Sequence, residues 1–471
     1  MGSGVVARGE SDAEPEARRP PNILLIVMDD LGWSDLACYG SDLHETPHLD
    51  QLAEQGVRFS AAYAAPVCSP TRAALMTGKH PARLHLTVWS EASRERSLRS
   101  NRPLLAPETI ADLPHREVTL AELLRPAGYL TAHIGKWHLG DSAHYPETQG
   151  FDLNIGGTHW GAPPTFFFPY HGRWSNTEEY RYVPGLPWGK PGEYLTDRLT
   201  DEALRVLEKA GDRPFFLSLN YYAVHTPIEA KPELVERYRS RLTPEHKHQN
   251  PTYAAMVQTV DENVGRLMEG LDRLGVSDET WILVLSDNGG YINEYRGTPV
   301  TTNHPLRSGK GSLYEGGVRV PLIIRKPGGE GSGEVIDEPV TVMDLFATIV
   351  DLAHVELDPE HAETLDGVSL LPLLEEPATW AGHEALYWHF PHDYPTTTPV
   401  GAIRSGDWKL LEYFEDGRLE LFHLANDLGE QEELASQHPE RAVELHRQLV
   451  DWRDRVGAQM PLPNPAKQVD P

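Results

Sequence analysis

The sequence predicts an α/β fold in which helices sandwich a large, mostly parallel sheet, with a smaller C-terminal antiparallel sheet and helix. Three observations lead to this prediction. Short apolar runs recur along the chain, amphipathic helical segments lie between them, and the chain changes to short β-like stretches after residue 375. Strands that alternate with helices indicate a parallel sheet covered on both faces.

The predicted strands are apolar runs that end in polar residues. They are "NILLIV" (22–27), "YLTAHIG" (129–135), "FFLSLN" (215–220) and "WILVLS" (281–286). Runs without a polar face are typical of strands buried on both sides. The predicted helices span 46–56, 119–128, 199–211 and 253–275, and several carry an N-cap Ser or Thr and a closing Gly.

The C-terminal part has a different pattern. "YFEDGRLELF" places an Asp-Gly pair between two β-like runs, which indicates a hairpin. Residues 438–457 form an amphipathic helical pattern. We therefore expect a disordered lead at 1–21, a large domain at 22–375, and a small α+β subdomain with a loose tail at 376–471.

Composition limits the partners and the compartment. The chain has 471 residues, with Asp+Glu 70 against Lys+Arg 42 and a formal net charge of −28. This acidity disfavours nucleic acid and anionic membrane surfaces, and no apolar run approaches the length of a membrane span. The N-terminus lacks a signal-peptide pattern, so we expect a cytoplasmic protein, although a trimmed chain would look the same. The two cysteines, Cys38 and Cys68, are too few for a disulfide framework, and one Cys38–Cys68 disulfide is the alternative.

Polar residues at the strand ends form the first candidate site. Ligands bind at the carboxyl ends of strands in open α/β sheets, so these side chains are expected to converge. They are Asp29, Asp30, Lys136, His138, His225, Asp287 and Asn288. The Asp and Asn oxygens suit a hard cation such as Ca²⁺ or Mg²⁺ rather than zinc. On its own, the Asp-Asp pair would be explained equally well by helix capping.

Each remaining candidate has a structural alternative. Lys136 and His138 flank a Trp in "GKWHLG" and would also fit a charged surface loop. His225 would also fit a core histidine, and Lys310, in a glycine-dense loop, an exposed lysine. Cys68 would fit either a small buried side chain or a thiolate nucleophile at a helix N-terminus.

Residues 68–78, "CSPTRAALMTG", match the pattern Cys-x-Pro-x-Arg followed by four residues and Thr-Gly. Further segments stand in a matching order: "PNILLIVMDDLGWSDLACYG", "GYLTAHIGKWHLG", "HTP", "LVLSDNGG", "GKGSLYEGGVRVPLIIRKPG" and "RSGDWKLLEY". From about residue 21 to about 456, the chain resembles a type I sulfatase of the alkaline phosphatase superfamily. It is similar to arylsulfatases and N-acetylgalactosamine sulfatases.

The resemblance implies that Cys68 is oxidised to Cα-formylglycine by a formylglycine-generating enzyme, which reads Pro70 and Arg72. Hydration of the aldehyde gives a geminal diol. One hydroxyl attacks the sulfur of a sulfate ester, the alcohol leaves, and deprotonation of the second hydroxyl releases sulfate. The implied activity is that of a sulfuric ester hydrolase acting on a sulfated carbohydrate or an aryl sulfate.

The resemblance also implies the metal ligands and the catalytic roles. The ligands are Asp29, Asp30, Asp287 and Asn288 together with residue 68. The expected cation is Ca²⁺, and the oxygen set also suits Mg²⁺. Arg72 positions the diol, and Lys136 and Lys310 bind sulfate oxygens. His138 is the base of the second step, and His225 contacts the sulfate and helps to protonate the leaving oxygen.

Two segments are candidates for substrate contacts. Residues 158–174, "THWGAPPTFFFPYHGRW", form either a stacking wall or a structural loop filled by aromatic rings. Residues 389–399 of the second subdomain are expected to reach over the site, as in relatives. His159, His171 and His392 are the residues proposed to contact the substrate.

Two other functions compete with a sulfatase. A phosphonate monoester, phosphodiester or phosphomonoester hydrolase of the same superfamily is the nearest rival, because formylglycine also serves such enzymes. The extra Asp and His ligands of a two-zinc phosphatase site are not seen in the sequence. Loss of Cys68 or of a metal ligand would favour a non-catalytic binding protein, and neither is lost.

Overall fold

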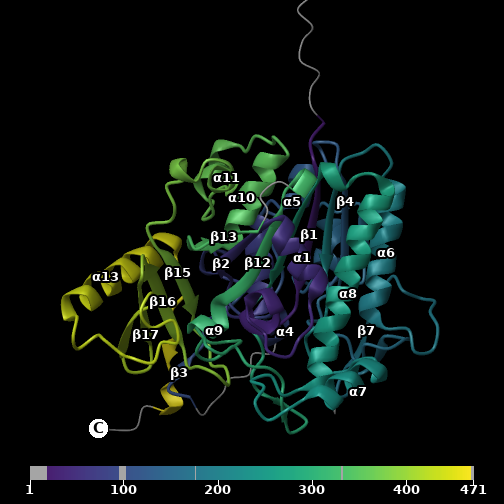
Figure 1. Cartoon of the computed structure of the whole chain (residues 1–471). Coiled ribbons are helices and arrows are strands. Elements are labelled where there is room, and N and C mark those ends of the chain that lie inside the picture. The colour runs from purple at the N-terminus through teal and green to yellow at the C-terminus, as the bar shows by residue number, and fades with distance from the viewer. Residues whose placement is uncertain (1–18, 95–101, 176, 330–332, 468–471) are drawn as a thin grey trace, which may run out of the picture.

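The computed structural model describes residues 19–94, 102–175, 177–329 and 333–467. The strands of its large sheet are β1 (Asn22–Met28), β2 (Val57–Tyr63), β4 (Leu130–Gly135), β5 (Leu153–Ile155), β8 (Phe215–Asn220), β9 (Thr280–Ser286), β12 (Arg319–Arg325), β13 (Glu334–Ile336) and β14 (Val340–Thr341). They lie in the order β13–β2–β12–β9–β1–β8–β4–β5, and β14 pairs with β2. Figure 1 labels β13, β2, β12, β1 and β4 of this sheet.

Strand register brings several strand ends to one edge of this sheet. β1 lies between β9 and β8 and is parallel to both, with Met28 opposite Ser286 and Val27 opposite Asn220. β4 follows in parallel, with Gly135 also opposite Asn220. β12 is the exception, because it runs antiparallel to β9 and β2. The other strand pairs are parallel, so the sheet is mostly parallel, as predicted. The residues that follow β1, β4, β8 and β9 therefore leave the sheet side by side.

Helices cover both faces of the sheet. The described helices are α1 (Pro47–Gln55), α2 (Cys68–Thr77), α3 (Pro81–Leu84), α4 (Ser90–Arg94), α5 (Leu120–Leu124), α6 (Leu195–Ala210), α7 (Pro232–Arg241), α8 (Pro251–Leu274), α9 (Glu315–Val318), α10 (Val342–Leu352), α11 (Pro359–Glu363), α12 (Leu371–Glu375) and α13 (Pro439–Val456). On one face α8 packs against α1, α6 and α7; on the other, α10 packs against α2 and α5. Figure 1 shows α6 and α8 side by side.

A second sheet confirms the predicted C-terminal pattern. β15 (Leu386–Phe390), β16 (Val400–Ser405), β17 (Trp408–Tyr413) and β18 (Leu419–His423) are antiparallel neighbours in that order. The Asp-Gly turn lies in the β17–β18 hairpin, and α13 packs on one face of this sheet. Its other face shares a core with Val67, which precedes Cys68, and with Leu313 and Tyr314. Short pairs complete the fold: β3 (Leu104–Leu105) with β19 (Leu462–Pro463), β6 (His171–Arg173) with β7 (Tyr180–Tyr182), and β10 (Glu294–Tyr295) with β11 (Thr298–Pro299).

The domain limits at 21/22 and 375/376 stay predictions. Residues 1–18 of the expected lead and residues 468–471 of the expected tail lie outside the described residues. Neither cysteine of the chain is in a disulfide. Among the described helices, none is long and apolar enough to cross a bilayer. The expected cytoplasmic location also stays a prediction.

A buried ion cluster joins the two sheets. Lys409 Nζ on β17 lies 2.7 Å from Glu315 Oε1 on α9 and 3.0 Å from Glu430 Oε1, and all three side chains are fully buried. We expect Lys409→Ala to lower the free energy of unfolding by about 3–5 kcal/mol, because it leaves the buried Glu430 carboxylate without its ion-pair partner. Urea unfolding measures this, with Lys209→Ala on the exposed side of α6 as the control. A loss no larger than that of the control would contradict the expectation.

Candidate active site

The edge where β1, β4, β8 and β9 end gathers the whole predicted metal and catalytic set. Cys68 is the first residue of α2 and is 3% exposed. Hydrogen bonds, ion pairs and electrostatic interactions link Cys68 to the other members of the set, either directly or through another member. These members are Asp29, Asp30, Arg72, Lys136, His138, His225, Asp287, Asn288 and Lys310. The convergence predicted from strand ends is therefore present in the structure.

The acidic half of the site offers buried oxygen atoms. Asp29, Asp30, Asp287 and Asn288 are at most 1% exposed. Asn288 Nδ2 donates to Asp30 Oδ1 at 2.8 Å, and the Asp30 amide donates to Asp287 Oδ1 at 3.2 Å. Asp29 Oδ1 and Asn288 Oδ1 have no hydrogen-bond partner. A buried oxygen without a partner is costly, so these residues fit a hard cation such as Ca²⁺.

Three cationic side chains balance these carboxylates. Lys136 Nζ lies 2.7 Å from Asp29 Oδ2, and Lys310 Nζ lies 2.6 Å from Asp30 Oδ1. Arg72 donates from Nε and Nη2 to Asp287 Oδ2, at 3.0 and 2.8 Å. Its Nη1 also donates to the Lys136 carbonyl at 2.8 Å, so the guanidinium is fixed in place.

The pKa values of the carboxyls reflect this competition between burial and charge. Burial holds the pKa of Asp29 well above its usual value, although the Lys136 ammonium opposes it. Burial also acts on Asp30, but Lys310, His225 and Lys136 outweigh it and lower its pKa. The pKa of Asp287 is likewise lowered, because Arg72 and Lys136 outweigh burial.

The side chain of Cys68 lies next to His138, and Glu91 binds the opposite ring nitrogen of that histidine. His138 Nδ1 lies 3.3 Å from Cys68 Sγ, and His138 Nε2 pairs with Glu91. Glu91 Oε1 accepts from the Gly161 amide at 2.8 Å. Burial would raise the pKa of Cys68, but Lys136, His138 and Lys310 lower it to about 6. Burial would lower the pKa of His138, but Glu91 raises it.

His225 lies on the metal side of the site. Its Nδ1 is 2.8 Å from the Thr226 carbonyl, and its Nε2 is 3.6 Å from Asp30 Oδ2. The contact with the carbonyl assigns the proton of the neutral ring to Nδ1 and leaves the Nε2 lone pair toward Asp30. Burial lowers the pKa of His225 to about 3, although Asp30 opposes it.

A pocket of about 310 Å³ opens in front of residue 68. It is lined by Cys68, Trp89, Glu91, His138, Gly161, Ala162, Trp174, Thr177, Glu179, Arg181, His225, Lys310 and Tyr394. The Arg181 guanidinium lies 4.1 Å from the centre of the Trp174 ring and 3.0 Å from Glu179 Oε2. Aromatic and charged side chains thus line the pocket that Cys68 shares.

The structure does not bring the three predicted substrate histidines into this pocket. His392 is 6% exposed, and its Nε2 lies 2.8 Å from Thr87 Oγ1. His171 is exposed and pairs with Tyr180, and the ring of His159 packs on Trp160. None of the three is among the described residues that line the pocket. Their contact with substrate stays a prediction. The aromatic wall is formed by Trp89, by Trp174 from the predicted segment 158–174 and by Tyr394 from the predicted segment 389–399.

Glu91 and Arg181 are site residues that sequence reasoning missed. Glu91 lies in "VWSEAS", which carries no recognisable pattern, and it meets His138 across 47 positions of the chain. Arg181 lies on the short strand β7, in a segment where no apolar period marks a pocket wall. Only the folded arrangement identifies these two residues.

We expect Glu91→Gln to lower kcat by roughly 10- to 100-fold with little change in KM. The reason is that His138 loses the carboxylate that orients its ring and stabilises its protonated form. Steady-state kinetics measure this, with Glu178→Gln as the control. Glu178 is exposed, pairs with Arg173 and does not line the pocket. Equal kcat values for both variants would contradict a positioning role for Glu91.

Comparison with protein families now gives the class. The family model "Sulfatase" matches residues 21–355, and the model "N-sulphoglucosamine sulphohydrolase, C-terminal" matches residues 308–455. The chain belongs to the sulfatase family and is a sulfuric ester hydrolase with the alkaline phosphatase-like fold. The resemblance inferred from the motifs is confirmed.

Curated relatives carry sulfatase names. The chain is 30% identical to a "Sulfatase" of Formosa agariphila, covering 94% of this chain and 90% of that protein. It is 34% identical to the N-acetylgalactosamine-6-sulfatase of Homo sapiens, covering 80% and 73% of the two chains. It is also 34% identical to the steryl-sulfatase of Mus musculus, covering 83% and 70%.

Solved structures show a similar fold. Ps i-CgsB in complex with k-i-k-neocarrahexaose has a TM-score of 0.75 and 31% identity, covering 92% of this chain and 93% of that chain. The phosphonate monoester hydrolase of Agrobacterium radiobacter has a TM-score of 0.67 at 20% identity, covering 93% and 96%. At that identity, the second likeness shows the fold alone.

Proposed function

We propose that this sulfatase removes sulfate from a sulfated saccharide, with residue 68 converted to formylglycine and with Ca²⁺ as the cation. The observation that carries the proposal is the position of Cys68 Sγ. It forms part of the pocket wall, 3.3 Å from His138 Nδ1, and Lys310 lines the same pocket. An anionic ester group that enters the pocket would reach residue 68 beside these cationic side chains.

The proposed ligands of the cation are Asp29, Asp30, Asp287 and Asn288, with residue 68. Support comes from the two buried oxygens without a partner, on Asp29 and Asn288. When bound, a divalent cation supplies Lewis-acid polarisation of sulfuryl and hydroxyl oxygens. An oxygen-only ligand set agrees with Ca²⁺, and Mg²⁺ is the alternative to be measured.

The remaining residues would orient the ester and move protons. Lys136 and Lys310 would bind sulfuryl oxygens, since their ammonium groups lie at the same sheet edge as Cys68. Arg72 would hold residue 68 in place. His138 would take a proton from residue 68 through Nδ1, while Glu91 stabilises the charged ring. His225 would donate to the leaving oxygen from its protonated form, which a bound sulfate anion favours.

The shape and chemistry of the pocket support a saccharide. Trp89, Trp174 and Tyr394 provide faces on which sugar rings stack, and Glu179 and Arg181 provide hydroxyl partners. Two relatives are consistent with this class: one is named an N-acetylgalactosamine-6-sulfatase, and Ps i-CgsB was solved with k-i-k-neocarrahexaose.

The test compares substrates at equal enzyme concentration. Sulfated mono- and oligosaccharides, 4-nitrophenyl sulfate and a phosphonate monoester are assayed for sulfate or phenol release. We expect the highest kcat/KM for a sulfated saccharide. A higher value for the aryl sulfate would overturn the saccharide proposal, and a higher value for the phosphonate would favour the rival hydrolase.

A further inference from the structure

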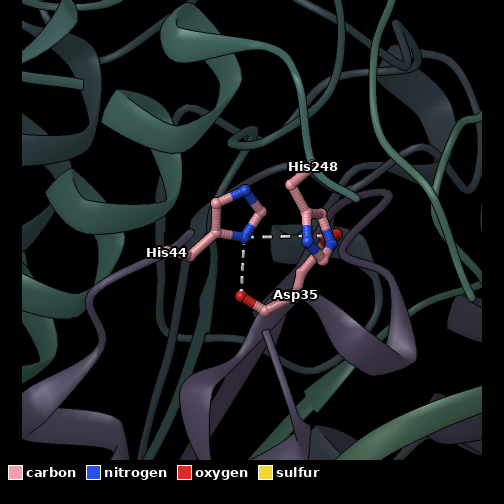
Figure 2. Close-up of side chains that lie close together, drawn as sticks. All are labelled: Asp35, His44 and His248. Carbon is pink, nitrogen blue, oxygen red and sulfur yellow. Dashed lines mark hydrogen bonds and ion pairs between the residues drawn. The ribbon is translucent and has the colours of Figure 1, made fainter. Parts of the chain in front are cut away.

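A second group of ligand-type atoms lies outside the pocket at Cys68. Asp35 follows β1, His44 precedes α1, and His248 precedes α8. One ligand atom from each of the three residues lies within 4.8 Å of the other two. Figure 2 shows both imidazole rings next to the Asp35 carboxylate. His248 Nε2 is 3.2 Å from Asp35 Oδ1, and His44 Nδ1 is 3.7 Å from the same oxygen.

The group is enclosed and its carboxylate is fixed. The Asp35, His44 and His248 side chains are 0%, 1% and 4% exposed. Asp35 Oδ2 accepts from the Gly32 amide and the Tyr253 hydroxyl, both at 2.6 Å. The charge of Asp35 is therefore held in one position, turned toward the two rings.

One buried nitrogen in this group lacks a hydrogen-bond partner. His248 Nε2 has no hydrogen-bond partner of its own, and the nearest charged atom is Asp35 Oδ1 at 3.2 Å. The other ring nitrogen, Nδ1, lies 2.9 Å from Asp42 Oδ1. A carboxylate on the far nitrogen of an imidazole is the usual support of a metal-bound histidine. Asp42 thus directs Nε2 inward.

A proton on His248 is the competing explanation. Burial would lower the pKa of His248, but Asp35 and Asp42 raise it, so an imidazolium between two carboxylates would form. Burial lowers the pKa of His44 to about 4, and its ring packs 4.4 Å from the ring of His248, so a second proton on this pair is disfavoured. A cation between the three atoms would use one nitrogen of each ring.

We propose that Asp35 Oδ1, His44 Nδ1 and His248 Nε2 bind a transition metal ion of the zinc class, separate from the Ca²⁺ site. Two imidazole nitrogens and one carboxylate oxygen are a zinc-type donor set. The 3.2 and 3.7 Å separations are close to the roughly 3.3 Å between ligands of a tetrahedral zinc ion. Binding moves the His44 proton from Nδ1 to Nε2, since Nδ1 now lies 2.8 Å from the Asp35 carbonyl.

The ion would brace the segment that carries two Ca²⁺ ligands. The Tyr253 hydroxyl, which donates to Asp35, also lies 3.3 Å from the carbonyl oxygen of Asp30. The ion would join this segment to the chain before α1 and before α8. Its role is therefore structural, and the proposal does not rest on the substrate proposed above.

The test measures metal content, not turnover. The full-length protein carries Cys68→Ala, so that the Cys68 thiol cannot bind zinc. This protein is saturated with Ca²⁺ and dialysed against Zn²⁺, and its bound zinc is measured by inductively coupled plasma mass spectrometry. We expect about one zinc ion per chain. In the same background, His248→Gln is expected to lose this zinc, and Asp42→Asn to bind it roughly 10- to 100-fold more weakly.

The matched control is His144→Gln, in the partly exposed group Asp112–Asp141–His144, and it should keep its zinc. Cobalt in place of zinc should give visible d–d absorption that His44→Asn removes. No zinc above background in the Ca²⁺-saturated protein would overturn the proposal. So would unchanged zinc affinity in Asp42→Asn, whose half-exposed side chain makes this variant the safer one to fold.

Discussion

Cys68→Ala is expected to lower kcat by roughly 10⁴-fold or more, because it removes the group that attacks the ester. The other cysteine provides the control: Cys38 is half-buried and lies outside the pocket, so Cys38→Ala should keep its activity. Sulfate release measures the change, and thermal unfolding shows that both variants fold. A Cys68→Ala protein that keeps more than a tenth of the wild-type activity would contradict the assignment of residue 68 as the nucleophile.

Cys68→Ser tests the same position with nearly the same volume. Serine supplies one hydroxyl, whereas the proposed diol supplies two, and the second hydroxyl is needed to release sulfate. We therefore expect no sustained turnover from Cys68→Ser. Continued turnover would show that residue 68 does not act as formylglycine.

Asp29→Asn is expected to lose the cation and to lower kcat by at least about 100-fold. Its unpartnered Oδ1 is one of the two oxygens that fit the ion, and its Oδ2 holds Lys136. The amide removes a negative charge and leaves the buried Lys136 ammonium without its partner. Calorimetric Ca²⁺ titration and kcat measure the effect, with the exposed Asp212→Asn as the control. Unchanged Ca²⁺ affinity in Asp29→Asn would contradict the ligand set.

The sheet and the central site follow from local sequence patterns. Apolar runs such as 22–27 and 281–286 became β1 and β9, and their pairing in parallel register brought Asp29 and Asp287 together. The physical reason is general: parallel strands place their carboxyl ends at one edge. The helix at 253–275 became α8, since its apolar period and closing glycine are local signals.

Side chains that act across distant loops could not be predicted this way. Glu91 reaches His138 from a segment without a pattern, and His248 lies 213 positions from Asp35. His392 does not line the pocket; its ring lies beside Thr87 and Phe390, and its contact with substrate stays a prediction. Whether a histidine faces a pocket or a core depends on how two sheets dock, and no short stretch of sequence encodes that contact.

The chemical state of residue 68 decides whether this chain acts through formylglycine. Tandem mass spectrometry of the peptide that contains residue 68 is made on protein co-expressed with a formylglycine-generating enzyme. We expect a mass about 18 Da below that of the cysteine peptide, with the change on residue 68. A residue 68 that remains a thiol under these conditions would contradict it.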